Sequence, residues 1–243
     1  MISVFKLTTY ECIKRKIFLY SFIVYICLFF LVNVITGDNP LLLTNKYLLS
    51  IIYYLSVIFL IFISFDMISR NIEDGSIELY LSKPIGRNEF FLYRFFSVIL
   101  IIPFTNFVFQ ILLTLLVLFK TGEFNICYIK VFVSVFVIFC VFFSSFLITS
   151  ILTYRFNMNL LIFIGFIIFN IFYNIVDNFI IIKNSIKITE IIFLFYFFSP
   201  RFVEFCSLAV NNNENYVNLY LHSFLFILLC LFISNIIIYN SDF

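Results

Sequence analysis

The sequence has little charge, little glycine or proline, and no tryptophan. Only 12% of its 243 residues are charged and 64% are hydrophobic, whereas a soluble domain is about 25% charged and about 45–50% apolar. A water-soluble fold of this length has nowhere to bury so much apolar surface, so the bilayer must be its solvent.

Residues that build metal, catalytic or nucleotide sites are also scarce. His222 is the only histidine, and the six cysteines include no Cys-x-x-Cys pair, whereas metal centres and intramembrane enzymes need several converging ligands or acids. None of the five glycines is followed by lysine, as a phosphate-binding P-loop requires. We therefore predict no catalytic residue, no metal or cofactor bound by this chain, and no ATPase motif.

Long apolar runs are what the sequence has in abundance. A helix needs about 20 apolar residues to cross the hydrocarbon core, and hydropathy predicts six such spans. They cover roughly residues 17–36, 47–66, 93–118, 127–153, 159–180 and 217–239. The predicted fold class is an all-α polytopic membrane protein, with residues 1–243 forming a single transmembrane domain.

Basic residues give the predicted orientation. An even number of spans places both ends on one side, and a cytoplasmic placement puts nine of the 15 basic residues inside and six outside. The cluster Lys14-Arg15-Lys16 directly precedes the first span, where the positive-inside bias is strongest. We expect a multi-pass protein of the cell membrane, in a bacterium the inner membrane, with both termini in the cytoplasm.

Two segments fall outside the plain six-span pattern. Residues 2–16 carry scattered apolar positions, among them Phe5, Cys12 and Ile13, and predict an interfacial helix that leads into the membrane. Residues 188–210 contain an apolar run that is too short to span and is broken by Ser199-Pro200-Arg201. They predict a re-entrant or surface element between spans five and six.

One polar segment interrupts the apolar sequence between spans two and three. Of the 15 basic and 13 acidic residues, nine lie between Asp66 and Arg94. Gly75 can turn the chain after span two, and the residue before Pro84 is biased away from helical geometry, which bounds a short helix. Past Gly86 a second helix is expected to start and to run through Arg94 into span three.

Residues 77–81 fit two local structures. In a helix, Ile77, Tyr80 and Leu81 share one face, whereas the alternating pattern Ile-Glu-Leu-Tyr-Leu also fits a strand. A lone strand at the membrane surface has no partner, so we prefer the helix. A charged connection between spans is by default a solvated loop, but the ordered glycine, proline and charges favour a short lever that transmits a push from a soluble partner.

Residues 68–94 resemble the signature of the type-2 permeases of ATP-binding-cassette (ABC) transporters, an exporter family with six spans per subunit. These permeases carry, after span two, an acidic residue, Gly-Thr or Gly-Ser, an apolar stretch, Ser-x-Pro-x-Ser-Arg and Gly-Lys. The matching residues, in order, are Glu73, Gly75, Ser76, Ser82, Pro84 and Arg87. Asn71 replaces a frequent glutamate, Gly86 replaces the usual serine, and Tyr93-Arg94 replaces Gly-Lys.

The resemblance implies a permease subunit that couples ATP hydrolysis by a separate ATPase to export, through a coupling helix within residues 67–92. The residues implied in coupling are Glu73, Gly75, Ser76, Ile77, Tyr80, Leu81, Pro84 and Arg87. A permease homodimer and two ATPase subunits carrying ATP and Mg²⁺ would form the assembly. The alternative is a non-transporting subunit of the same kind of complex, which transmits force to a periplasmic partner or anchors it. The sequence selects no substrate.

Two polar stripes inside predicted spans are candidates for a translocation path. They are Asn106 and Gln110 in span three, and Asn170, Asn174 and Asp177 in span five. Each set repeats at helical spacing and therefore shares one face of its helix. Polar groups inside a membrane favour a functional role, but amides also join helices, with hydrogen bonds of about 0.6 kcal/mol on average. Both interpretations stay open.

Overall fold

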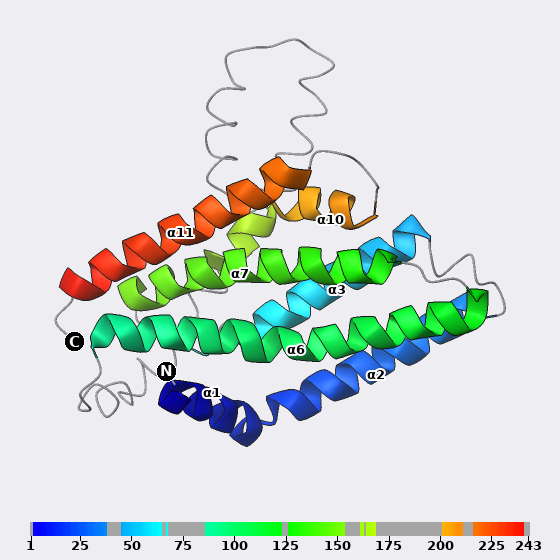
Figure 1. Cartoon of the computed structure of the whole chain (residues 1–243), viewed down its shortest axis with the longest axis horizontal. Helices are drawn as coiled ribbons and strands as arrows, with labels where there is room; N and C mark the ends of the chain where they lie inside the picture. Colours follow the sequence, from blue (N-terminus) through cyan, green and yellow to red (C-terminus); the bar gives the residue numbers. More distant parts are fainter. Residues whose placement is uncertain are drawn as a thin grey trace, which may run out of the picture.

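Figure 1 shows a computed structural model of the chain, in which the long elements are all helices. It describes residues 2–37, 45–64, 67, 86–122, 126–153, 161–162, 164–168, 201–210 and 216–240. The helices are α1 (Ile2–Lys14), α2 (Ile17–Thr36), α3 (Lys46–Ser64), α6 (Arg87–Thr121), α7 (Cys127–Thr153), α10 (Phe202–Val210) and α11 (Tyr216–Asn240). No strand occurs in these ranges, and the predicted all-α class is confirmed.

Five of the helices are long and apolar enough to cross a membrane, namely α2, α3, α6, α7 and α11. They coincide with five of the six predicted spans, although α3 ends at Ser64 and α6 extends beyond the predicted residues 93–118 at both ends. The remaining predicted span, 159–180, lies mostly outside the described residues. These helices are those of a multi-pass membrane protein.

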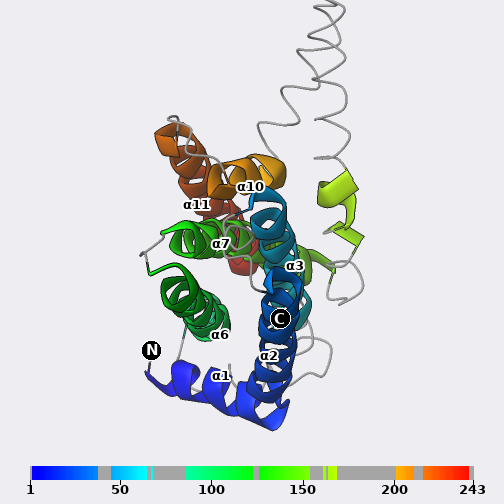
Figure 2. The same cartoon turned by 90° about the vertical axis from the view of Figure 1, so that its right-hand side faces the viewer.

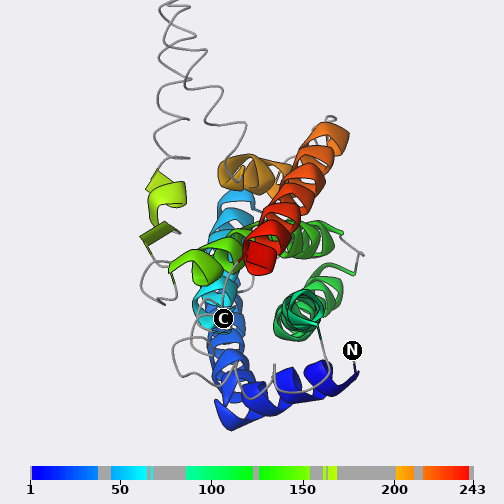
Figure 3. The ribbon, with the colours of Figure 1, turned by 90° about the vertical axis from the view of Figure 1, so that its left-hand side faces the viewer.

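Helix α7 forms the centre of the bundle. It packs against α3, α6, α10 and α11 and is the most deeply buried of the five spans. Helix α1 runs across the bundle at one end, as the views along the bundle show (Figures 2 and 3). At this N-terminal end lie the starts of α2 and α6 and the ends of α3, α7 and α11, whereas α10 lies at the opposite, distal end (Figure 1).

Helix α6 is the longest described element and contains the last eight residues of the polar segment, 87–94. Its 35 residues extend about 52 Å, far more than the hydrocarbon core of about 30 Å. It begins directly after Gly86, continues through Pro103, and ends before Gly122, whose φ of 71° caps the helix in the left-handed conformation. The prediction that a helix starts past Gly86 and runs through Arg94 into span three is confirmed.

Helix α1 confirms the predicted N-terminal helix and buries one of its faces. Val4, Thr8 and Cys12 are buried at a spacing of four residues, and the helix packs on α6. Phe5 and Ile13, two of the apolar positions noted in the sequence, are exposed. The sequence predicted no buried face for this helix, and a threonine occupies the centre of the one observed. The exposed Phe5 and Ile13 suit a helix lying at the membrane interface.

The chain turns from α1 into α2 at Lys16, which has a φ of 55° and a ψ of 27°. This left-handed conformation disfavours side chains branched at Cβ but suits asparagine. We expect Lys16→Asn to preserve stability and Lys16→Val to lower it by about 1–2 kcal/mol. Both variants remove the same charge, so the difference between their thermal unfolding in detergent isolates the backbone effect. Equal unfolding would contradict the turn.

Helix α10 provides a short element before the last span, as predicted. Its nine residues extend about 14 Å, too little to cross the membrane, and it packs on α3 and α7 at the distal end. Phe205 and Cys206 are buried. Burial raises the pKa of the Cys206 thiol, against the opposing effect of its hydrogen bonds with the Tyr54 and Ser50 side chains. The preceding residues 188–200 lie outside the described residues.

Candidate functional site

Most of the residues predicted for coupling lie outside the described part of the chain. These are Glu73, Gly75, Ser76, Ile77, Tyr80, Leu81 and Pro84. Arg87 is the first residue of α6, which follows Gly86. The structure does describe both ends of this segment, because it includes Met67 at the start and Gly86 with the first turns of α6 at the end. We call Met67 and the first two turns of α6 the flanks of the segment. These two flanks are held together by one side chain.

Arg94, two turns into α6, is a fully buried arginine that joins three parts of the chain. Its Nη1 donates to the Thr8 hydroxyl of α1 at 2.8 Å. Its Nη2 donates to the backbone carbonyl of Met67 at 3.2 Å and forms an ion pair with the Glu11 carboxylate of α1. We call Arg94, Glu11, Thr8 and Met67 the arginine cluster.

Burial makes the arginine cluster costly to break. The Arg94 side chain is 1% exposed and that of Glu11 is 13% exposed, so water cannot replace a lost partner. A buried charge is tolerated only when it is paired and hydrogen-bonded, and two of the three guanidinium nitrogens meet this condition. The Nε of Arg94 has no hydrogen-bond partner among the described residues. Removing either charged partner would leave the other charge uncompensated.

A second basic residue reaches the same place from the turn between α1 and α2. Nη1 of Arg15 lies 3.9 Å from the sulfur of Met67, and Met67 is fully buried. Met67, three residues beyond the end of α3, therefore lies between Arg94 of α6 and Arg15. The flanks of the segment predicted for coupling are therefore joined to α1 as well as to each other.

Sequence reasoning missed Glu11, Thr8 and Met67 as functional candidates and treated Arg94 only as a departure from the family pattern. One signal was present, because Glu11 is the only acidic residue among the first 37. A single carboxylate within a basic segment next to the membrane calls for a cationic partner. Its partner is 83 positions away, a separation that no local pattern reveals.

The first predicted polar stripe lies inside the bundle. Asn106 is fully buried and Gln110 is 2% exposed. The Gln110 side-chain Nε2 donates to the Asn106 Oδ1 at 3.4 Å, which is a long hydrogen bond. The Nδ2 of Asn106 and the Oε1 of Gln110 find no partner in the described part of the chain. The second stripe, Asn170, Asn174 and Asp177, lies outside the described residues.

Other spans contribute polar atoms of the same kind near these amides. The Tyr25 hydroxyl of α2, the Ser56 Oγ of α3 and the Ser134 Oγ of α7 are buried and lack a hydrogen-bond partner among the described residues. We call these three residues, together with Asn106 and Gln110, the polar layer. A buried polar atom without a partner costs about 1–3 kcal/mol, so this layer is unfavourable unless water or another molecule satisfies it.

Aromatic contacts place the polar layer at a similar depth in all four spans. The Tyr25 ring lies 4.7 Å from that of Phe109 and 5.2 Å from that of Phe59, and the Phe107 ring lies 5.1 Å from that of Phe132. Tyr25 is itself one of these aromatic residues. Each of the other four residues of the layer lies within three sequence positions of one of them, which corresponds to at most about 5 Å along the helix axis. The layer therefore crosses the interior of the bundle rather than one helix surface.

The described residues offer no other site for chemistry. Among them, no three His, Cys, Asp or Glu side chains gather where they could hold a metal ion. The six cysteines form no disulfide, and Cys12, Cys140, Cys206 and Cys230 are buried. The arginine cluster and the polar layer are thus the two candidate functional sites, one mechanical and one within the membrane.

Together, the fold and these sites define a class of protein: a multi-pass helical membrane subunit with a braced polar segment between its second and third spans. Residues 7–204 match the family model described as ABC-2 family transporter protein. Because this match covers most of the chain, the protein belongs to the ABC-2 transporter family, and the predicted relation to type-2 ABC permeases is confirmed. A comparison with curated protein sequences finds no match.

Proposed function

We propose that the chain is the transmembrane permease subunit of an ATP-driven exporter. The coupling segment, residues 67–92, would dock on a separate ATPase subunit, which binds ATP and Mg²⁺. Two permease copies and two ATPases would form the complex. The arginine cluster carries this proposal, because it fastens both flanks of the segment to α1 at the N-terminal end of the bundle.

The cluster gives the coupling segment a stiff connection to the spans. A charged, hydrogen-bonded group held in a dry site is directional, unlike an apolar contact, and resists sliding. A push on the segment therefore displaces α1, the end of α3 and the start of α6 together. Because α6 continues as one helix to Thr121, the same displacement extends to the distal end of the bundle.

The positions of the described helices support six crossings. Helix α7 ends at the N-terminal end of the bundle, whereas α10 and the start of α11 lie at the distal end (Figure 1). Phe205 of α10 and Tyr220 of α11 are in ring contact there, at 5.7 Å. Six crossings therefore stay part of the proposal, with the predicted span 159–180 as the additional one. The basic residues then favour the cytoplasm for the N-terminal end.

The polar layer supports transport over the non-transporting alternative. A subunit that only transmits force needs no unsatisfied polar atoms in its interior. Asn106 and Gln110 retain two such atoms at mid-bundle, as a path that admits polar groups or water would require. The alternative role uses the same arginine cluster, and neighbouring reading frames that encode an ATPase or a periplasmic partner would separate the two.

Substitutions at the neighbouring residues Tyr80 and Leu79 test whether the proposed coupling helix docks on the ATPase. In a helix, Tyr80 lies on the face of Ile77 and Leu81, and Leu79 points away from it; in a strand, Leu79 would join that face and Tyr80 would leave it. We expect Tyr80→Asp to abolish co-purification of the ATPase and Leu79→Asp to leave it intact. The reverse result would indicate a strand. Retention of the ATPase by both variants and by Leu81→Asp would overturn the coupling role.

A further inference from the structure

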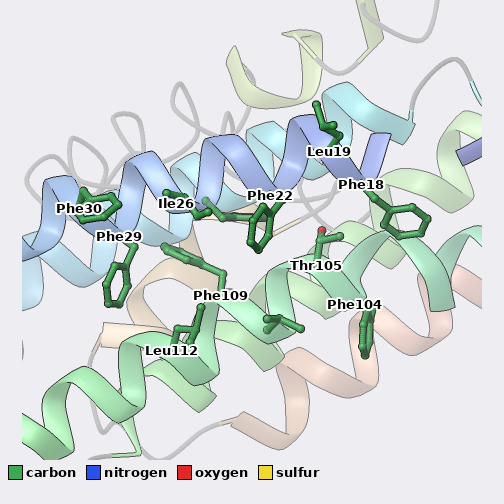
Figure 4. Close-up of a pocket in the computed structure, with 12 residues that line it drawn as sticks. Phe18, Leu19, Phe22, Ile26, Phe29, Phe30, Phe104, Thr105, Phe109 and Leu112 are labelled. Carbon is green, nitrogen blue, oxygen red and sulfur yellow. The ribbon is translucent and has the colours of Figure 1, made fainter. Parts of the chain in front are cut away.

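A long apolar groove separates α2 from α6 on the outside of the bundle. Its volume is about 830 Å³, within the about 300–1,000 Å³ of typical ligand sites. Figure 4 shows Phe22 and Phe29 pointing from α2 towards α6, and Thr105 pointing from α6 towards α2. Thr105 and Tyr25 carry the only side-chain polar atoms of its lining, so an occupant would be almost entirely hydrocarbon.

The groove is held open by contacts along the two helices. The Tyr25 ring stacks on Phe109 at 4.7 Å, and at the distal end Lys120 donates to the Gly37 carbonyl at 2.8 Å and the Thr36 hydroxyl at 3.3 Å. Tyr25 with Phe109 and Thr36 with Lys120 are both 84 positions apart, so the helices run parallel in one register. The groove is therefore a built feature of the bundle.

Charge at one end of the groove indicates the occupant. The groove starts at Phe18, two residues after the basic cluster, in which Lys14 and Lys16 are exposed. The only nearby acid in α1, Glu11, is paired with Arg94, so it does not neutralise these lysines. From Phe18 to Phe30 the α2 lining extends about 18 Å, close to the about 15 Å depth of one leaflet of hydrocarbon.

We infer that the groove binds an acyl chain of an anionic phospholipid whose phosphate is held by Lys14 and Lys16. The lipid belongs to the leaflet that borders the basic cluster, which is the cytoplasmic leaflet in the proposed orientation. An apolar groove next to a basic patch at the membrane surface matches both halves of such a lipid. The site faces the bilayer and shares Tyr25 with the polar layer, whereas Asn106 and Gln110 do not line it and lie on another face of α6.

The inference is tested by filling the groove. In the full chain in nanodiscs, Val108→Trp places an indole in the groove, whereas Ile111→Trp, at nearly equal exposure on α6, does not line it. Native mass spectrometry after exposure to phosphatidylglycerol should show bound lipid on the wild type and on Ile111→Trp. We expect a severalfold loss on Val108→Trp. Leu112→Trp, also in the groove, serves as the second filling variant.

The charge requirement is tested separately. Lys14→Gln and Lys16→Gln should each reduce the preference for phosphatidylglycerol over phosphatidylcholine about fivefold, equivalent to about 1 kcal/mol per basic residue. Lys46→Gln, at the distal start of α3, should not change it. Equal retention of the two lipids by the wild type would overturn the headgroup assignment. Unchanged lipid retention in both tryptophan variants would overturn the lipid site. Dissociation of a dimer into monomers in these variants, without loss of lipid, would instead indicate that the groove is a contact between copies.

Discussion

The Arg94→Met variant is expected to unfold about 3 kcal/mol more easily than the wild type, because it leaves the Glu11 carboxylate buried without its cation. The Thr8 hydroxyl and the Met67 carbonyl lose a donor at the same time. Thermal or denaturant unfolding in detergent measures this loss. The matched control is Arg201→Met, since Arg201 pairs with the partly exposed Glu204 at 3.2 Å, and such surface pairs contribute about 0–1 kcal/mol.

The double variant Arg94→Met/Glu11→Leu separates the stabilising role of the arginine cluster from its mechanical role. Apolar replacement of both members of a buried ion pair is often neutral, so we expect most of the stability to return. The hydrogen bonds from Arg94 to Thr8 of α1 and to the Met67 carbonyl stay absent in the double variant. In the complex with its ATPase, spin labels at Tyr10 of α1 and Phe119 of α6, both exposed, should keep a fixed distance through the ATP cycle in the wild type and lose it in the double variant. A fixed distance in both would refute the mechanical role.

The second large effect is a gain in stability, which we expect when leucine replaces both Asn106 and Gln110. Asn106→Leu/Gln110→Leu removes two buried atoms without partners and one hydrogen bond of 3.4 Å. Because unsatisfied buried groups cost about 1–3 kcal/mol each, we expect the double variant to be about 1–2 kcal/mol more stable than the wild type. If these amides line a path that must open during transport, the more stable protein should also show slower ATP-dependent turnover in its complex.

The alternative interpretation, in which Asn106 and Gln110 join helices, predicts that their replacement by leucine lowers the stability of the protein. Thr114→Val is the control on the same helix, because the Thr114 hydroxyl has a partner: it donates to the backbone carbonyl of Gln110 at 2.8 Å. We expect that change to alter stability by less than about 0.5 kcal/mol, as is usual away from unsatisfied groups. Loss of stability in the double variant would therefore assign the amides to packing.

The sequence alone determined that this protein lies in a lipid bilayer and in which order its helices follow one another. Hydropathy is a sum over neighbouring residues, so α2, α3, α6, α7 and α11 could be located without any contact. The start of α6 past Gly86 could be predicted because the backbone effects of the neighbouring proline and glycine are local. The run from 68 to 94 pointed to the ABC-2 family because its glycine, serine, proline and arginine residues resemble the signature of that family in order and spacing.

Only the tertiary structure decided which residues meet. Lipid tails are as apolar as a protein core, so spans that are apolar all round carry no pattern that marks their buried face. The register of α2 against α6, the buried face of α1 and the pairing of Arg94 with Glu11 depend instead on helix packing between residues more than 80 positions apart. Arg94, a departure from the family pattern in the sequence, joins α1, α6 and Met67 because packing removed it from water.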